Sequence, residues 1–306
     1  AAPIDDGFEL GIANSLWLQK DLDFVEEYLN LLAGHYGAVP NLVDFMANHE
    51  AARIQINDWV AGETGDRIMD LLQPGVLDRL TRLVLVNAIY FKAAWEYPFG
   101  DGSTRKLPFY LLDGSPVNVD LMNVSAPFKY WRGDGLLAVE LPYKFSRQHM
   151  LLIVPDRGRF KDVEQSLSTG LLGRIDEGLK GRHLNLWLPE FEFETQLGLA
   201  DALAEFGAPN AFDPERAAFD RINGQSCLRG DPNCLAIKDA IHKAFISVDE
   251  DGIEAAAATA IVIGVTVSEG PRPQPLRVRI DRPFMFLIRD DATDAILFAG
   301  RVIDPR

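Results

Sequence analysis

Apolar residues in the first quarter of the chain recur at the spacing of an amphipathic helix. Between residues 22 and 32 the apolar positions are Leu22, Val25, Tyr28, Leu29 and Leu32, which predicts a helix. Residues 51–72 show the same spacing, and Gly62 and Gly65 are expected to break this second helix. A shorter amphipathic stretch at 199–206 predicts a third helix that ends at the following glycine.

Longer apolar runs later in the chain predict strands. Residues 83–91 read LVLVNAIYF, which is typical of a strand buried on both faces, and 149–154 form a second such run. Residues 184–188 and 191–195 alternate apolar and polar side chains, as half-buried strands do.

The C-terminal end predicts a hairpin. Apolar strands at 283–288 and 296–303 flank the polar loop DDATD. A few helices with extensive sheet indicate an α+β fold. No repeat or low-complexity linker divides residues 1–306, so we expect a single domain.

One segment, 248–263, carries two conflicting local preferences. Its sequence VDEDGIEAAAATAIVI holds four consecutive alanines, which favour helix, followed by β-branched residues from Ile261, which favour strand. Such inconsistency is expected where a segment adopts more than one conformation. An ordinary helix followed by a strand is the alternative.

The net charge of the chain limits the classes of partner that it is expected to bind. The formal net charge is −15 over 306 residues, which argues against binding to nucleic acid or to anionic membrane surfaces. No apolar run approaches the roughly 18 residues that span a bilayer. We expect a monomer without nucleic-acid or membrane partners.

The sequence carries no motif of an enzyme, a metal site or a cofactor site. HExxH, GxSxG, a Walker loop and GxGxxG are absent, and the five histidines are scattered. We therefore expect no catalytic activity, no metal and no cofactor.

The two cysteines, Cys227 and Cys234, are not spaced as zinc ligands are, and either a disulfide or two free thiols fits the sequence. A disulfide would indicate an oxidising compartment. The chain starts Ala1-Ala2-Pro3 without an initiator methionine, so either a leader was removed or upstream residues are missing. An extracellular or periplasmic location is our expectation.

Several segments together resemble the serpin family. The resemblance rests on five motifs in the family's order, and it covers nearly the whole chain. They are NDWVAGETGDRIMDLL at 57–72, VNAIYFKAAWEYPF at 86–99, IHKAFISVDEDGIEAAAAT at 241–259, VRIDRPFMFLI at 278–288 and ILFAGRVIDP at 296–305. The acidic composition favours a prokaryotic member.

This resemblance implies a large mixed sheet, smaller sheets, surrounding helices and an exposed reactive-centre loop. It also implies an irreversible suicide-substrate inhibitor of serine proteases. The protease cleaves the loop, and the loop then inserts into the central sheet and traps the acyl-enzyme, an instance of strand addition. A non-inhibitory serpin-like binding or chaperone protein is the alternative.

The resemblance places the hinge and the inserting strand within residues 250–260. The residues are Glu250, Gly252, Ile253, Glu254, Ala255, Ala256, Ala257, Ala258, Thr259 and Ala260. Small side chains and the absence of proline suit a strand that enters a sheet. At roughly 1 kcal/mol per hydrogen bond, insertion of about 14 residues would contribute on the order of 10–20 kcal/mol.

The family's usual spacing from Gly252 puts the reactive bond at Thr266–Val267, with Val267–Ser268 as the alternative. Both offer a small or β-branched side chain, which suits elastase-like or subtilisin-like proteases and disfavours trypsin-like ones. Cleavage at Arg272 or Arg277 is a further alternative.

The resemblance also implies gating roles for Asn87, Trp95 and His242, which would hold the sheet closed without any bond-making chemistry. Taken alone, a single histidine such as His242 is usually a hydrogen-bonded structural residue. Two features depart from the family's pattern. Ile253 stands where inhibitors usually have Thr or Ser. The given sequence does not include the helices that usually precede the segment at 8–18, so that either they were removed, or they are missing from this sequence, or the protein is a shortened variant.

Overall fold

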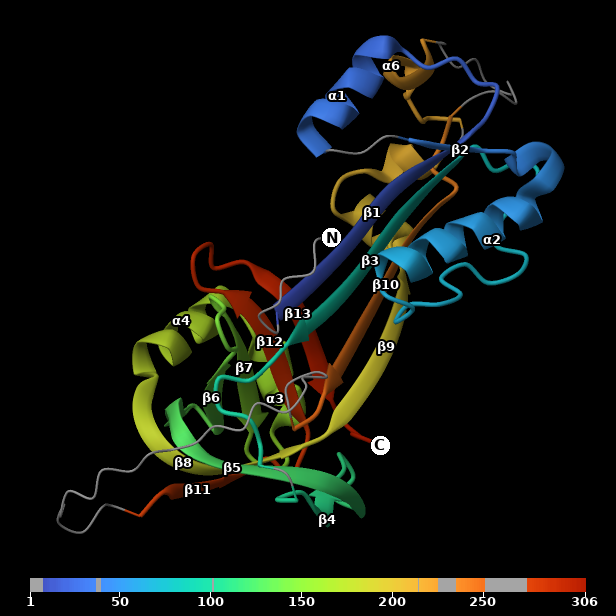
Figure 1. The fold of residues 1–306 in the computed structure, drawn as a ribbon. Helices are drawn as coiled ribbons and strands as arrows, with labels where there is room; N and C mark the ends of the chain where they lie inside the picture. The colour runs from blue at the N-terminus through green and yellow to red at the C-terminus, as the bar shows by residue number, and fades with distance from the viewer. Residues whose placement is uncertain (1–7, 37–39, 101, 214, 225–234, 251–273) are drawn as a thin grey trace. The chain divides into compact units, whose positions relative to one another are not determined.

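The computed structural model describes residues 8–36, 40–100, 102–213, 215–224, 235–250 and 274–306 (Figure 1). The chain separates into two compact units. The first consists chiefly of Leu10–Phe91 and Phe193–Ile246, and the second of Lys92–Glu192 and Ser247–Arg306.

The first unit is built on a five-stranded sheet with the order β2-β1-β3-β10-β9. The strands are β1 (Phe8–Gln19), β2 (Asn41–Val43), β3 (Leu83–Ala93), β9 (Phe191–Gly198) and β10 (Asp239–Val248). β1 pairs in parallel with β2, and β3 pairs in parallel with β10. The strand predicted at 83–91 is therefore confirmed, and it lies in the middle of the sheet.

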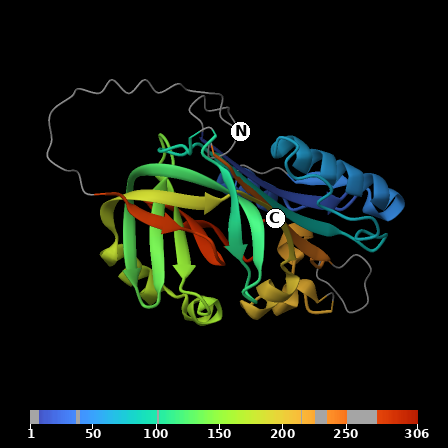
Figure 2. The same cartoon turned by 90° about the horizontal axis from the view of Figure 1, so that it is seen from below.

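Helix α2 (Phe45–Glu63) covers one face of this sheet (Figure 2). The side chain of Asp44 caps its first turn by accepting a hydrogen bond from the Ala47 amide at 3.0 Å. The helix ends before Thr64, and Gly65 follows with a φ of +57°, a conformation that suits glycine. The predicted helix at 51–72 is thus confirmed in its first part and ends where its glycines indicated.

The opposite face of the sheet is covered less completely. Leu16, Leu18 and Leu83 pack with Ile222 of α6 (Asp220–Asn223) and with side chains of α1 (Glu26–Tyr36). Further along β3, Leu85, Asn87 and Ile89 are only half-buried. The expectation that 83–91 is buried on both faces is therefore wrong for alternate residues.

Two of the predicted helices have slightly different ends in the structure. Helix α1 begins at residue 26 rather than 22, because the Val25 amide donates to the Ile222 carbonyl and the chain before it turns at Asp21. The helix predicted at 199–206 is confirmed as α5 (Ala200–Glu205). A short 3-10 helix, η1 (Pro209–Phe212), follows it.

The second unit contains an eight-stranded sheet with the order β11-β8-β5-β6-β7-β12-β13, and β4 pairs with β5. The strands are β4 (Arg105–Tyr110), β5 (Pro116–Gly133), β6 (Leu136–Pro142), β7 (Gln148–Pro155), β8 (Lys180–Pro189), β11 (Leu276–Arg279), β12 (Phe284–Asp290) and β13 (Ile296–Val302). The strands predicted at 149–154 and 184–188 correspond to β7 and β8. The predicted C-terminal hairpin is confirmed as the antiparallel pair β12–β13.

Helices α3 (Phe160–Ser166) and α4 (Thr169–Gly178) cover one face of this second sheet. Leu151 and Ile153 of β7 and Leu287 of β12 pack against Ile175 of α4. Their burial explains the continuous apolar runs that the sequence shows in these strands.

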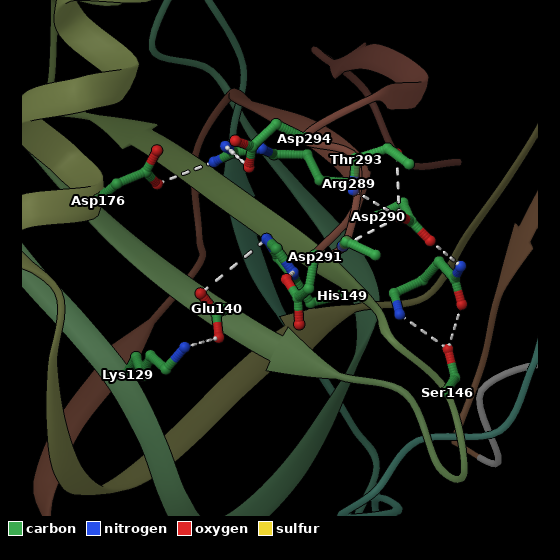
Figure 3. A network of polar contacts seen from close by, with 12 residues as sticks. Lys129, Glu140, Ser146, His149, Asp176, Arg289, Asp290, Asp291, Thr293 and Asp294 are labelled. Atoms are coloured by element: carbon green, nitrogen blue, oxygen red, sulfur yellow. Dashed lines mark hydrogen bonds and ion pairs between the residues drawn. The ribbon is translucent and has the colours of Figure 1, made fainter.

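A polar network continues this face beyond the apolar core (Figure 3). Arg289 of β12, only 11% exposed, lies 2.8 Å from Asp176 of α4. His149 of β7 lies 2.7 Å from Asp291 in the turn after β12, and Lys129 lies 2.7 Å from Glu140 on neighbouring strands. The network attaches α4 and the turn at 290–294 to the sheet, so its role is structural.

Candidate functional site

The first part of the candidate site is the junction between β3 and β10, which we call the seam. Seven residue pairs run from Asp239–Val84 to Phe245–Tyr90, all in parallel register. Within the part of the chain that the structure describes, no strand lies between these two. The seam is therefore closed, and it lies directly before the segment that the sequence marks as a hinge.

Two predicted gating residues face each other across the seam. His242 and Asn87 are paired in register, and Nδ1 of His242 lies 2.5 Å from Oδ1 of Asn87. An amide oxygen only accepts, so the imidazole donates. Asn87 in turn donates from Nδ2 to Oδ1 of Asn14 at 2.6 Å. A polar line thus crosses the neighbouring strands β10, β3 and β1.

The environment of His242 favours its neutral form. The ring is half-buried, and burial lowers its pKa below the ordinary value because a charged imidazole loses hydration there. Beside this polar line the same face of the sheet is hollowed by a cavity of about 500 Å³. Its lining includes Leu16, Tyr28, Leu85 and Leu203, which make it largely apolar.

The opposite face of the seam is crossed by the segment that follows α2. Lys243 is buried, and its Nζ donates to the Met69 carbonyl and to Glu194, each at 2.7 Å. The side chain of Asn57 both donates to and accepts from the backbone of Leu72, at 3.0 and 2.8 Å. These contacts attach the segment at 64–77 to α2 and to β10.

Trp95, the third predicted gating residue, lies in a buried aromatic cluster of the second unit. Its ring stacks on Tyr143 with centroids 4.7 Å apart, and it meets Phe99 edge-on at 6.2 Å. Its indole Nε1 donates to the carbonyl of Asp249 at 3.1 Å. Trp95 therefore holds the backbone immediately after β10.

Glu250, the first residue of the predicted hinge, is held by two hydrogen bonds. Its carbonyl accepts from the Phe99 amide at 2.9 Å, and its carboxylate accepts from the Thr104 hydroxyl at 2.6 Å. The charge of Glu250 acts on the carboxyl group of Glu190. Burial first, and then the charges of Glu250 and Asp120, raise the pKa of Glu190 to about 7.

Sequence reasoning missed several of these contacts. Asn14, Thr104, Tyr143, Glu190 and Lys243 carried no local signal, because each acts on a residue far away in the chain. A long separation such as the 146 residues between Thr104 and Glu250 is resolved only by the fold.

The remaining site predictions, with the exception of Arg277, fall outside the described residues. They concern the hinge and inserting strand from Gly252 to Ala260, the reactive bond at Thr266, Val267 and Ser268, the alternatives Arg272 and Arg277 near the loop, and Cys227 and Cys234. Of these, Arg277 alone is described; it lies at the start of β11.

Two searches of the described residues gave negative results. No group of three or more His, Cys, Asp or Glu residues there is arranged to hold a metal ion. No helix in the same ranges has the length and apolar character needed to cross a membrane.

Comparison with known proteins connects these features to a family. The family model "Serpin (serine protease inhibitor)" matches residues 4–305. An uncharacterized serpin-like protein of Thermococcus kodakarensis is 37% identical over 306 residues, covering 100% of this chain and 68% of the relative. Antithrombin-III of Mus musculus is 38% identical over 299 residues, covering 97% of this chain and 63% of that protein. The chain thus spans about two thirds of the length of these relatives.

Solved structures agree with the sequence relatives. Uncleaved ovalbumin superimposes with a TM-score of 0.85 at 26% identity, over 99% of this chain and 75% of that one. Thyroxine-binding globulin in complex with thyroxine gives 0.84 at 28% identity, over 99% and 77%. With a family model over nearly its full length and relatives above 30% identity, the chain belongs to the serpin family.

Proposed function

We propose that this protein is an irreversible inhibitor of serine proteases that acts as a suicide substrate. The observation that carries the proposal is the closed seam. β3 and β10 pair directly in parallel, and β10 leads into a proline-free segment of small residues.

The direction in which that segment would insert into the sheet follows from its connection to β10. A strand that follows β10 and folds back runs antiparallel to β10, and so also to β3. Insertion therefore replaces the one parallel ladder of hydrogen bonds between β3 and β10 with two antiparallel ladders. Antiparallel pairing is at least as stable per residue as parallel pairing. The gain in hydrogen bonds drives the conversion.

The covalent step belongs to the protease. Its serine oxygen attacks the carbonyl carbon of Thr266, and the bond between that carbon and the Val267 nitrogen breaks. The serine proton passes through the protease histidine to the leaving Val267 amine. The protease remains attached through an ester to Thr266 while the cleaved loop inserts, so hydrolysis of that ester is prevented.

The sequence of the loop supports a narrow class of targets. Threonine or valine before the reactive bond fits the shallow apolar pocket of elastase-like or subtilisin-like enzymes. An extracellular or periplasmic location is part of the same proposal.

Incubation with an elastase-like and a subtilisin-like protease, followed by denaturing gels, tests the proposal. We expect a covalent complex that survives SDS, with N-terminal sequencing of the released peptide starting at Val267 or Ser268. Clean cleavage of the loop without any complex would refute inhibition.

Two matched variants separate insertion from simple cleavage. In the proposed strand Ala257 shares a face with Ile253, and Ala256 shares the other face with Glu254. Ala257→Arg places a charge on the face that is buried, which is costly, and should turn the inhibitor into a substrate. Ala256→Arg places the same charge on the face that already holds Glu254 and should still form the complex.

A non-inhibitory binding or storage role is the second candidate. Ile253 after the hinge glycine favours it, and so does the likeness to thyroxine-binding globulin. The same incubation distinguishes the two, because a non-inhibitory member is cleaved without forming a complex.

A further inference from the structure

A cavity of about 680 Å³ lies in the second unit and shares no lining residue with the candidate site. Three segments that are distant in the chain contribute to it. They are the end of β4 with the turn after it, the end of β7 with the start of α3, and the two residues before β12. A volume of this size is within the range of pockets that hold small molecules. The cavity is therefore a candidate binding site.

Two hydrogen bonds connect the three segments to one another. The Tyr110 amide donates to the Asp281 carbonyl at 2.8 Å. Nε of Arg282 donates to the Pro155 carbonyl, also at 2.8 Å. Because these bonds fix the walls before any ligand arrives, binding has little chain ordering to overcome.

The walls of the cavity are largely apolar. Phe160 and Pro283 are buried in them, and Leu112 is 50% exposed at the rim. The Tyr110 ring forms one side and carries the Arg157 guanidinium 4.2 Å from its centre. A guanidinium is planar and weakly hydrated, so it can stack on a further flat group as well. This arrangement suits a ligand with a flat apolar body.

Each carboxylate in the lining already has a partner. Asp113 accepts from the Ser115 hydroxyl at 2.6 Å, and Asp156 lies 2.9 Å from Arg132. Asp162 lies 3.7 Å from the arginine three residues before it. These partners reduce the attraction that the carboxylates could offer to a cation.

The cations of the lining are less fully used. Lys161 forms no ion pair within the part of the chain that the structure describes. Arg157 lies 3.3 Å from Asp281, but that carboxylate also binds Arg282 at 3.2 Å. Positive charge therefore remains available here in a chain whose formal net charge is −15. It favours an anion as the ligand.

We propose that this cavity binds a small molecule with a flat aromatic body and one negatively charged group. The aromatic body stacks on the Arg157 guanidinium and contacts Leu112, and the ammonium group of Lys161 binds the anion. The proposal does not depend on the proposed inhibitory function, because no residue of the cavity belongs to the seam or to the hinge.

Calorimetric titration of the whole chain with naphthoate tests the proposal. Naphthalenemethanol has the same rings without the charge, and acetate has the charge without the rings. We expect naphthoate to bind on the order of tenfold more tightly than the alcohol, since both Lys161 and Arg157 attract the anion. Acetate should show no binding at the same concentrations. Equal affinities for naphthoate and the alcohol, or no binding of naphthoate, would overturn the proposal.

Matched variants assign the binding to this cavity. Lys161→Gln should weaken the binding of naphthoate about fivefold and leave that of the alcohol unchanged. Lys180→Gln, exposed on β8 outside the cavity, should match wild type. Leu112→Ser should weaken both naphthalene compounds. Leu80→Ser, at an exposed position outside the cavity, should weaken neither.

Amide chemical shifts locate the bound probe. Gly114 and Gly158 lie in the two turns at the rim, and a Cβ atom on either would meet no atom within 4 Å. Their amide resonances should shift with naphthoate and stay in place with acetate. Shifts confined to other parts of the chain, or a Lys161→Gln protein that binds naphthoate as wild type does, would contradict the site. Neither result bears on the protease assay, and failure of that assay leaves the cavity proposal standing.

Discussion

The indole ring of Trp95 lies almost parallel to the phenol ring of Tyr143, with a 13° angle between the planes and 4.7 Å between the centroids. Burial raises the pKa of Tyr143 well above its ordinary value, so the phenol stays neutral. The same indole donates to the Asp249 carbonyl. One side chain therefore combines aromatic packing with support for the backbone before the hinge.

Substitutions at Trp95 should separate these two contributions. Trp95→Phe keeps an aromatic ring against Tyr143 and loses the bond to Asp249, so the free energy of unfolding should fall by about 1 kcal/mol. Trp95→Ala also removes the buried ring and should cost about 3–5 kcal/mol. Urea denaturation measures both. Trp187→Phe is the control, because it loses a comparable indole bond, to Asn185, at a half-buried site on β8.

Asn57→Ala should destabilise the segment that follows α2. The change removes both side-chain bonds to Leu72 in a buried place and leaves the Leu72 amide without its partner. A loss of about 2–3 kcal/mol in the free energy of unfolding is expected. Asp58→Ala, at the exposed neighbouring position, should stay within about 0.5 kcal/mol of wild type. Equal effects of the two changes would contradict the structural role of Asn57.

The half-buried imidazole of His242 should make stability depend on pH. Its pKa is lower in the folded protein than in the unfolded chain, so the folded state binds fewer protons in the window below about 6.5. The contribution of His242 is present above that pH and is lost as the pH falls. Wild type should therefore lose stability relative to His242→Gln between pH 7 and pH 5. A difference that stays constant over this range would show that His242 does not titrate there.

Cleavage of the reactive loop should stabilise the protein. If the cut segment inserts at the seam, the melting temperature should rise by about 20 °C or more, given a gain on the order of 10 kcal/mol. Differential scanning calorimetry before and after limited proteolysis measures the change. Ala257→Arg should be cut without this rise, and an unchanged melt of cleaved wild type would exclude insertion.

Local sequence pattern predicted the elements that are periodic or strongly apolar. The strand at 83–91, the helix around Ile56 and the C-terminal hairpin all follow from side-chain spacing. Their ends were less predictable, because ends depend on contacts such as the Val25 amide with the Ile222 carbonyl.

The candidate site was predictable only as far as its motifs extend. Motif resemblance named Asn87 and His242, and the structure pairs them in register across the seam. The partners Glu190 and Thr104 could not be predicted, because nothing in the neighbourhood of either residue indicates Glu250. Long-range pairs of this kind arise from strand order, which periodicity does not encode.

The register of the seam allows the depth of strand insertion to be measured. A segment arriving from the end of β10 first separates Phe245 from Tyr90, and three residue pairs further along it meets the His242–Asn87 bond. Synthetic peptides with the loop sequence and increasing length would therefore stop at defined distances along the seam. The imidazole resonance of His242 would change only for peptides long enough to reach it, so that this ring would serve as an internal length marker.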